Sequence, residues 1–253
     1  MKFLRALGFL ILLLILIYFI GPRPATPKYI SELPDINVPT EKMDSFVNEQ
    51  ESHFDIKPDN NARIMWANGS SKEMTDYAVV YLHGFSASQE EGDPVHYTFA
   101  QKFGCNLFLS RLDAHGLISD EPLLEMTAEG LYNSAKQALA IGKKLGRKVI
   151  LMSTSTGGTL ALKLAAEFPE IAGLILISPN IEINDSKAWM LNNPWGLQIA
   201  RLFKGRYNDI PDTTAIYAQY WNNHYRMEAT VQLQELLETT MKHSVFKKIK
   251  QPL

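Results

Sequence analysis

Four short apolar runs, separated by helical segments, restrict the folds open to this chain more than any other feature. The runs are 78–82 (AVVYL), 106–110 (NLFLS), 148–152 (KVILM) and 173–177 (GLILI), with 62–66 as a weaker candidate strand. Consecutive apolar positions are typical of strands buried on both faces. The helical segments between them are 94–103, 127–145 and 157–168. This alternation predicts an α/β fold, with a mainly parallel sheet flanked by helices on both faces.

Two of the expected helices carry local signals of their own. Thr127 can cap the first turn of the segment 127–145, and Gly146 can end it. In the segment 157–168 the apolar residues recur at helical spacing, which is typical of a helix that packs on a sheet. They are Leu160, Ala161, Leu164, Ala165 and Phe168.

The amino terminus has a different pattern, a continuous apolar run over residues 6–21 that follows Lys2 and Arg5. With the residues before it, the run reaches about 20 residues, the length that spans a bilayer as a helix. Pro22 ends any such helix. Large side chains continue to Ile20 and no A-x-A-like site follows, so we expect an uncleaved signal anchor or transmembrane helix over 1–21. A cleaved signal peptide and a buried core helix are the alternatives.

The charges around this run suggest an orientation. Lys2, Arg5 and the amino terminus precede it, while Arg23 and Lys28 follow it. The positive-inside rule places the amino terminus inside, so we expect the body on the periplasmic or extracytoplasmic side of a membrane. If the run is a cleaved signal peptide, the body is secreted.

The rest of the chain divides by its composition. Residues 22–53 are rich in proline and polar residues near their start and are expected to form a tether. Residues 54–179 form the α/β core. After Pro179 the regularity ends, and residues 180–245 carry three of the four tryptophans. We expect a helical cap there, followed at 246–253 by the incomplete start of the carboxyl-terminal part of the core.

Charge and cysteine content exclude several classes of protein. The formal net charge is −2, whereas a nucleic-acid-binding protein normally has a strong basic excess. The one cysteine, Cys105, can form no internal disulfide, and a cysteine-based zinc site needs several. We expect no cofactor, no metal and no nucleic-acid partner, and we expect Cys105 to be an inert core residue.

The chemically informative segment lies between the strand at 148–152 and the helix at 157–168. It contains the pattern S-x-S-x-G, formed by Ser153, Ser155 and Gly157. A strand–turn–helix context with small neighbours is what a nucleophile elbow requires, and Ser153 stands where glycine is usual. The helix amino terminus also favours developing negative charge. A Ser/Thr-rich capping turn is the structural alternative.

A second motif, His83-Gly84-Phe85, follows the strand at 78–82. With the elbow, the segment 111–116 (RLDAHG) and the segment 177–180 (ISPN), it makes the chain resemble the α/β-hydrolase superfamily. The resemblance runs from about residue 78 to 253. It is closest to the esterases, monoacylglycerol lipases and serine aminopeptidase-like members.

The resemblance implies roles for particular residues. Ser155 is the expected nucleophile, and the backbone N–H groups of Phe85 and Thr156 are the expected oxyanion hole. His83 lies beside the oxyanion turn and is expected to shape the loop. His115 is expected to have a structural or pocket-lining role.

The same resemblance places the catalytic aspartate and histidine after the next strand, which would begin near Pro252. The acid and base are therefore expected beyond Leu253, so the chain is either a truncated form of a longer enzyme or a defective homologue. Glu182 and Asp185, early in the cap, are alternative positions for the acid.

These observations predict a membrane-anchored serine hydrolase that cleaves carboxylic esters, with lipid-derived esters as one substrate class. Its partners would be a small-molecule ester or acyl substrate and the membrane. A peptidase or amidase of the same fold and a non-catalytic protein of this fold are the alternatives. An aspartate-nucleophile dehalogenase is disfavoured because position 155 is serine.

Overall fold

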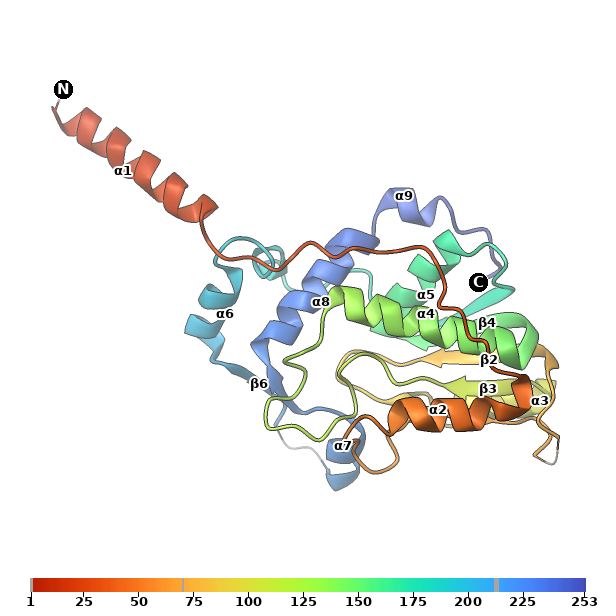
Figure 1. The fold of residues 1–253 in the computed structure, drawn as a ribbon. Coiled ribbons are helices and arrows are strands. Elements are labelled where there is room, and N and C mark those ends of the chain that lie inside the picture. The colour runs from red at the N-terminus through yellow and green to blue at the C-terminus, as the bar shows by residue number, and fades with distance from the viewer. Residues whose placement is uncertain (1, 70, 212–213) are drawn as a thin grey trace.

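A five-stranded sheet forms the centre of the computed structural model, which describes residues 2–69, 71–211 and 214–253 (Figure 1). The strand order is β1-β3-β2-β4-β5. β1 runs antiparallel to β3, and the other neighbouring strands are parallel. The strands are β1 (Arg63–Met65), β2 (Thr75–Leu82), β3 (Asn106–Leu109), β4 (Gly146–Thr154) and β5 (Gly173–Ile177). The predicted mainly parallel sheet is confirmed.

Helices cover both faces of the sheet, as predicted. On one face the main core includes Ala78 and Val80 of β2 together with residues of α4 and α5. On the other face, Val79 and Tyr81 of the same strand pack with Ala100 of α3. Alternate residues of β2 therefore serve two cores, which explains why the run is apolar at every position. These helices are α3 (Val95–Phe103), α4 (Ala128–Leu145) and α5 (Thr156–Glu167).

The predicted start of α4 is also confirmed. Thr127 is the N-cap, and its side-chain oxygen accepts a hydrogen bond from the Gly130 N–H at 2.9 Å. The bond satisfies one of the N–H groups that the first turn of a helix leaves without a partner.

Residues 22–53 depart from the expected tether. They contain the turn η1 (Thr40–Lys42) and the helix α2 (Met43–Glu51), in which Met43 and Val47 are buried in the main core. Before α2, the Tyr29 hydroxyl lies 2.7 Å from the Thr239 hydroxyl, and Lys136 Nζ donates to the Ile30 carbonyl at 2.7 Å. This segment is therefore attached to the body along most of its length, and only its composition resembles a linker.

The apolar amino-terminal run forms α1 (Lys2–Phe19), which buries none of its residues and projects away from the body (Figure 1). The alternative of a buried core helix is therefore wrong. α1 is long and apolar enough to cross a membrane, with a mean hydropathy of 2.2. By length and composition alone, a signal sequence has the same properties.

The expected helical cap is mixed in structure. It contains η3 (Ala188–Met190), α6 (Gly196–Lys204) and α7 (Ala215–Tyr220), and also β6 (Tyr207–Asp209) and β7 (His224–Arg226), which pair as an antiparallel ribbon. The last helix of the region, α8 (Met227–Thr240), contributes Ala229 and Leu236 to the main core. The region 180–245 is therefore part cap and part core.

The end of the chain lies beside β5. After α9 (His243–Phe246), the Pro252 carbonyl accepts a hydrogen bond from the Leu174 N–H at 3.0 Å. Gln251 Nε2 donates to the carbonyls of Ala165 and Phe168. The assignment of 246–253 as the start of a further part of the core stays a prediction.

Candidate active site

Ser155 lies in the sharp turn between β4 and α5, with φ 49° and ψ −116°. Positive φ is strained for a residue with a side chain, and such strain persists only where the surroundings hold it. Here the Ser155 N–H donates to the Ile177 carbonyl at 3.0 Å. The Ser155 carbonyl accepts from the N–H groups of Gly158 at 2.8 Å and Asn180 at 2.9 Å. The turn therefore has the backbone strain and the fixed geometry of a nucleophile elbow.

Two glycines allow α5 to begin close to the sheet. A Cβ at Gly157 would lie 2.0 Å from the Leu82 carbonyl oxygen, and a Cβ at Gly158 would lie 2.6 Å from Pro179 Cβ. The first clash is with backbone, which cannot rotate away. Ser153, which occupies the usual glycine position, is fully buried.

The segment 83–88 passes directly against this turn. The Cβ that Gly84 lacks would lie 3.2 Å from Ser155 Cβ, so any larger residue at position 84 would crowd Ser155. Phe85 follows, and its N–H donates to no protein acceptor among the described residues. Thr156 is the first residue of α5, and the first N–H groups of a helix have no partner within the helix.

His83 fixes the peptide that carries the Phe85 N–H. Its Nδ1 lies 2.9 Å from the Gly84 carbonyl oxygen, and its Nε2 accepts from the Leu112 N–H at 3.1 Å. This pairing assigns the neutral ring with the proton on Nδ1. Burial lowers the pKa of His83 well below its usual value, which keeps the ring neutral. The Gly84 carbonyl and the Phe85 N–H belong to one planar peptide, so the ring that binds the carbonyl also orients the N–H.

His115 holds the next peptide of the loop. Its Nε2 accepts from the Ser86 N–H at 3.0 Å, and its Nδ1 donates to the Asp113 carbonyl at 2.7 Å. Burial lowers the pKa of His115 to about 4. The two imidazoles lie edge to face at 5.1 Å between centroids. Both rings bond to backbone through both nitrogens, so neither is placed to take a proton from Ser155.

Glu91 binds the loop from the opposite side, and sequence reasoning missed it. Its Oε2 accepts from the Gly84 N–H at 2.6 Å. The missing Cβ of Gly84 would lie 2.8 Å from Glu91 Oε1, so this carboxylate and Ser155 flank the same glycine. Burial raises the pKa of Glu91, and the hydrogen bond from Gly84 opposes the rise. No sequence motif marks this residue, because the contact exists only once the turn η2 (Gln89–Gly92) folds back on the loop.

Ser155 opens into a cleft of about 890 Å³. Phe85 and Tyr225 lie on one side of it, with their rings edge to face at 5.1 Å. Glu182 and Asp185 lie on the other side, and both are exposed. The other lining residues are Ser178, Pro179, Asn180, Ile181, Ile183, Asn184, Ser186, Thr230 and Leu233. The cleft thus brings together Ser155, Phe85 and both alternative acid positions. None of the six histidines, all of which lie within the described residues, lines it.

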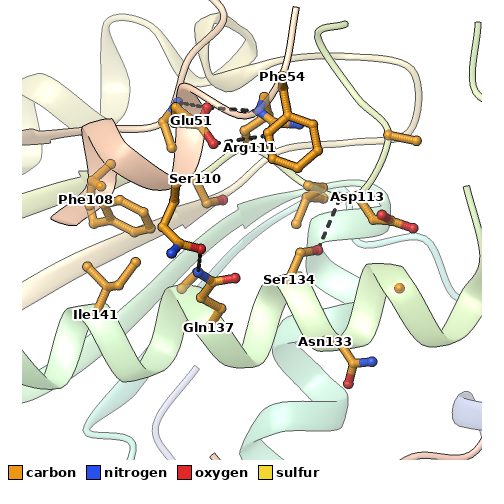
Figure 2. A pocket seen from close by; sticks show the side chains of 17 residues that line it. Glu51, Phe54, Phe108, Ser110, Arg111, Asp113, Asn133, Ser134, Gln137 and Ile141 are labelled. Atoms are coloured by element: carbon orange, nitrogen blue, oxygen red, sulfur yellow. Dashed lines mark hydrogen bonds and ion pairs between the residues drawn. The ribbon is translucent and has the colours of Figure 1, made fainter. Parts of the chain in front are cut away.

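A second, smaller cavity of about 300 Å³ lies between α2, β3 and α4, and it contains none of the predicted site residues (Figure 2). Arg111 crosses it, with Nε 2.8 Å from Glu51 Oε2 and its guanidinium over the ring of Phe54. Ser134 is bonded there to the Asp113 N–H. These polar groups have partners within the protein, so the contacts here join α2 to the core.

Comparisons with known proteins give one match by sequence and several by structure, while no family model matches. A thermostable monoacylglycerol lipase from Bacillus sp. (strain H-257) is 29% identical over 105 residues, which are 42% of this chain and 41% of the relative. The aligned part therefore spans about two fifths of that relative's length.

The solved structures cover more of the chain. The metagenome-derived lipolytic enzymes LipS and LipT match with a TM-score of 0.61 at 16% identity, over 78% of this chain and 75% of theirs. The monoacylglycerol lipase of Paleococcus ferrophilus matches with a TM-score of 0.52 at 15% identity, over 76% and 74%. A soluble variant of the monoglyceride lipase of Saccharomyces cerevisiae matches with 0.51 at 12% identity, over 86% and 72%. At these identities the likeness is one of fold.

Proposed function

We propose that this chain, which has the α/β-hydrolase fold, belongs to a serine hydrolase that cleaves carboxylic esters through an acyl-enzyme on Ser155. The observation that carries the proposal is the strained turn at Ser155, packed against a loop whose free N–H, that of Phe85, belongs to the same cleft. Strain maintained by several backbone hydrogen bonds is typical of a functional position.

In the proposed reaction Ser155 Oγ attacks the acyl carbonyl carbon, and the carbonyl oxygen becomes an oxyanion. The N–H groups of Phe85 and Thr156 would stabilise that charge, helped by the amino terminus of α5. Collapse of the intermediate expels the alcohol and leaves the acyl group on Ser155, and water then releases the acid. The proton from Ser155 needs a base, which we place, with the acid, beyond Leu253.

The cleft also suggests the substrate class. Pro179, Ile181, Ile183, Tyr225 and Leu233 give part of the cleft an apolar lining, and about 890 Å³ is enough for an acyl chain. The relatives named as lipolytic enzymes and monoacylglycerol lipases support a lipid-derived ester. We also propose that α1 anchors the protein in a membrane with the body on the outer side.

One observation favours a second candidate, a non-catalytic protein of this fold. No histidine of the described residues lines the cleft, and serine without a base is a weak nucleophile. The two candidates differ in their reaction with a fluorophosphonate, whose phosphorus is attacked by an activated serine with loss of fluoride, which leaves the serine phosphonylated.

The test compares this chain with a form extended through any downstream coding sequence. The extended form should be labelled by the fluorophosphonate and should hydrolyse p-nitrophenyl esters, while residues 1–253 should show little turnover per folded molecule. An extended form that is folded but unlabelled supports the non-catalytic candidate. Equal turnover by both forms would place the base within these 253 residues.

A further inference from the structure

α6 exposes the apolar stripe that a surface helix normally buries. Ile199, Leu202 and Phe203 are 40%, 80% and 81% exposed. Their i, i+3, i+4 spacing puts all three on one side of the helix. The opposite side of α6 packs against α8. The stripe is therefore exposed, whereas Arg201, on another side of the helix, pairs with Glu228 of α8.

α6, which carries the stripe, lies near the point where α1 joins the body (Figure 1). Trp195, the residue before α6, donates from Nε1 to the Ile17 carbonyl at 2.9 Å and from its N–H to the Pro22 carbonyl at 2.9 Å. A Cβ at Gly21 would lie 2.2 Å from the Trp195 ring, so the indole packs directly on the chain there. A bilayer crossed by α1 would end beside α6.

The charges around the stripe are basic. The charged residues of α6 are Arg201 and Lys204, Arg206 follows the helix, and Arg23 follows α1. Arg201 pairs with Glu228, whereas Lys204, Arg206 and Arg23 are exposed. Exposed apolar side chains bordered by lysine and arginine are the composition of helices that lie in a membrane interface.

We propose that the exposed face of α6 docks into the headgroup region of the membrane that α1 crosses. This inference rests on the proposed anchoring by α1, and it adds a second, peripheral point of attachment. The burial of Leu202 and Phe203 in the interface would stabilise it, and Lys204 and Arg206 would contact lipid phosphates. The chain runs from the cleft wall at Ser186 to α6 at Gly196, so docking also holds the cap close to acyl lipids.

The test uses the full chain reconstituted in phosphatidylcholine–phosphatidylglycerol vesicles, in a Cys105→Ser background. An NBD fluorophore is attached at Phe203→Cys and, as the matched control, at Phe103→Cys, another exposed aromatic position, at the end of α3. At position 203 we expect a blue-shifted emission and quenching by lipids brominated near the headgroup. At position 103 we expect the emission of an aqueous fluorophore and no quenching.

Equal quenching at both positions, or none at 203, overturns the docking proposal. Disulfide formation between two copies of Phe203→Cys would also overturn it, because the stripe would then bind a second copy. Carbonate extraction tests the anchoring by α1 separately from the docking of α6. Release of the protein by carbonate contradicts the anchor itself, whereas retention with an unquenched position 203 contradicts only the docking of α6.

Discussion

The two walls of the cleft are built in different ways. On the wall formed by the loop 83–88, the backbone groups beside Phe85 are bonded to the buried rings of His83 and His115 and to the half-buried carboxylate of Glu91. On the wall formed by residues 180–186, five of the seven residues are exposed, and the bond from the Asp185 N–H to the Ile183 carbonyl is local. A wall fixed by long-range contacts suits the proposed oxyanion, whose charge would need preorganised donors. A wall with few contacts can adapt to different substrates.

The largest effect should come from Ser155, the proposed nucleophile, which lies against the fixed wall. Ser155→Ala in the extended form should abolish fluorophosphonate labelling and lower ester turnover by about 10⁶-fold, as the loss of a serine nucleophile does elsewhere. Ser153→Ala is the control, because its hydroxyl is buried in β4 and it should still be labelled. Labelling that survives Ser155→Ala would move the nucleophile to another residue.

The next effect concerns stability. Gly157→Ala should lower the free energy of unfolding by at least about 3 kcal/mol, because the new Cβ meets the Leu82 carbonyl oxygen at 2.0 Å. Gly69→Ala, with nothing within 4 Å of its Cβ, should change it by less than about 0.5 kcal/mol. Urea denaturation of both variants measures the difference. Equal midpoints would mean that the elbow is looser than the contacts indicate.

A third prediction uses the neutral histidines of the fixed wall. The pKa of His115 is about 4 in the folded protein and near 6.5 when unfolded, so between these values the unfolded chain binds the extra proton. Stability should therefore fall as the pH falls through this window, by about 1.4 kcal/mol per pH unit for this group.

The variant His115→Gln should remove that part of the acid sensitivity. It should also cost about 2 kcal/mol at pH 7 through the lost hydrogen bonds of a buried group. His53→Gln, at an exposed position, is the control. Urea midpoints at pH 7 and pH 5 give both quantities, and an unchanged pH dependence in His115→Gln would contradict a buried, neutral ring.

The smallest effects should come from the open wall. Glu182→Gln and Asp185→Asn should each change the unfolding free energy by less than about 0.5 kcal/mol, because both residues are exposed. Ester turnover by the extended form should stay within a few-fold. A loss of about 10⁴-fold in either variant would identify it as the acid that supports the base and would erase the contrast between the walls.

The sequence predicted best those elements whose signal lies within a few neighbouring residues. The apolar run 173–177 coincides with β5, and Thr127 caps α4, because a buried strand and a capped helix have local signals. The elbow and the His-Gly turn were visible for the same reason.

The remaining features depend on contacts between distant residues. Tyr29 meets Thr239, and this pairing makes a proline-rich segment part of the body. The strands β6 and β7 have three residues each, too few to show a period of two. Glu91 acquires its role only when the turn after the loop returns to the Gly84 N–H. In each case folding brings together groups that no sequence window contains.

The contact between Trp195 and the carboxyl-terminal end of α1 limits how the body can rotate relative to α1. Without this contact, a flexible proline-rich segment would let the body adopt many orientations relative to the axis of α1. The two hydrogen bonds of Trp195 lie on either side of Gly21 and clamp that segment. These bonds therefore fix the orientation of the cleft relative to the axis of α1. The cap and α1 rotate together as one unit.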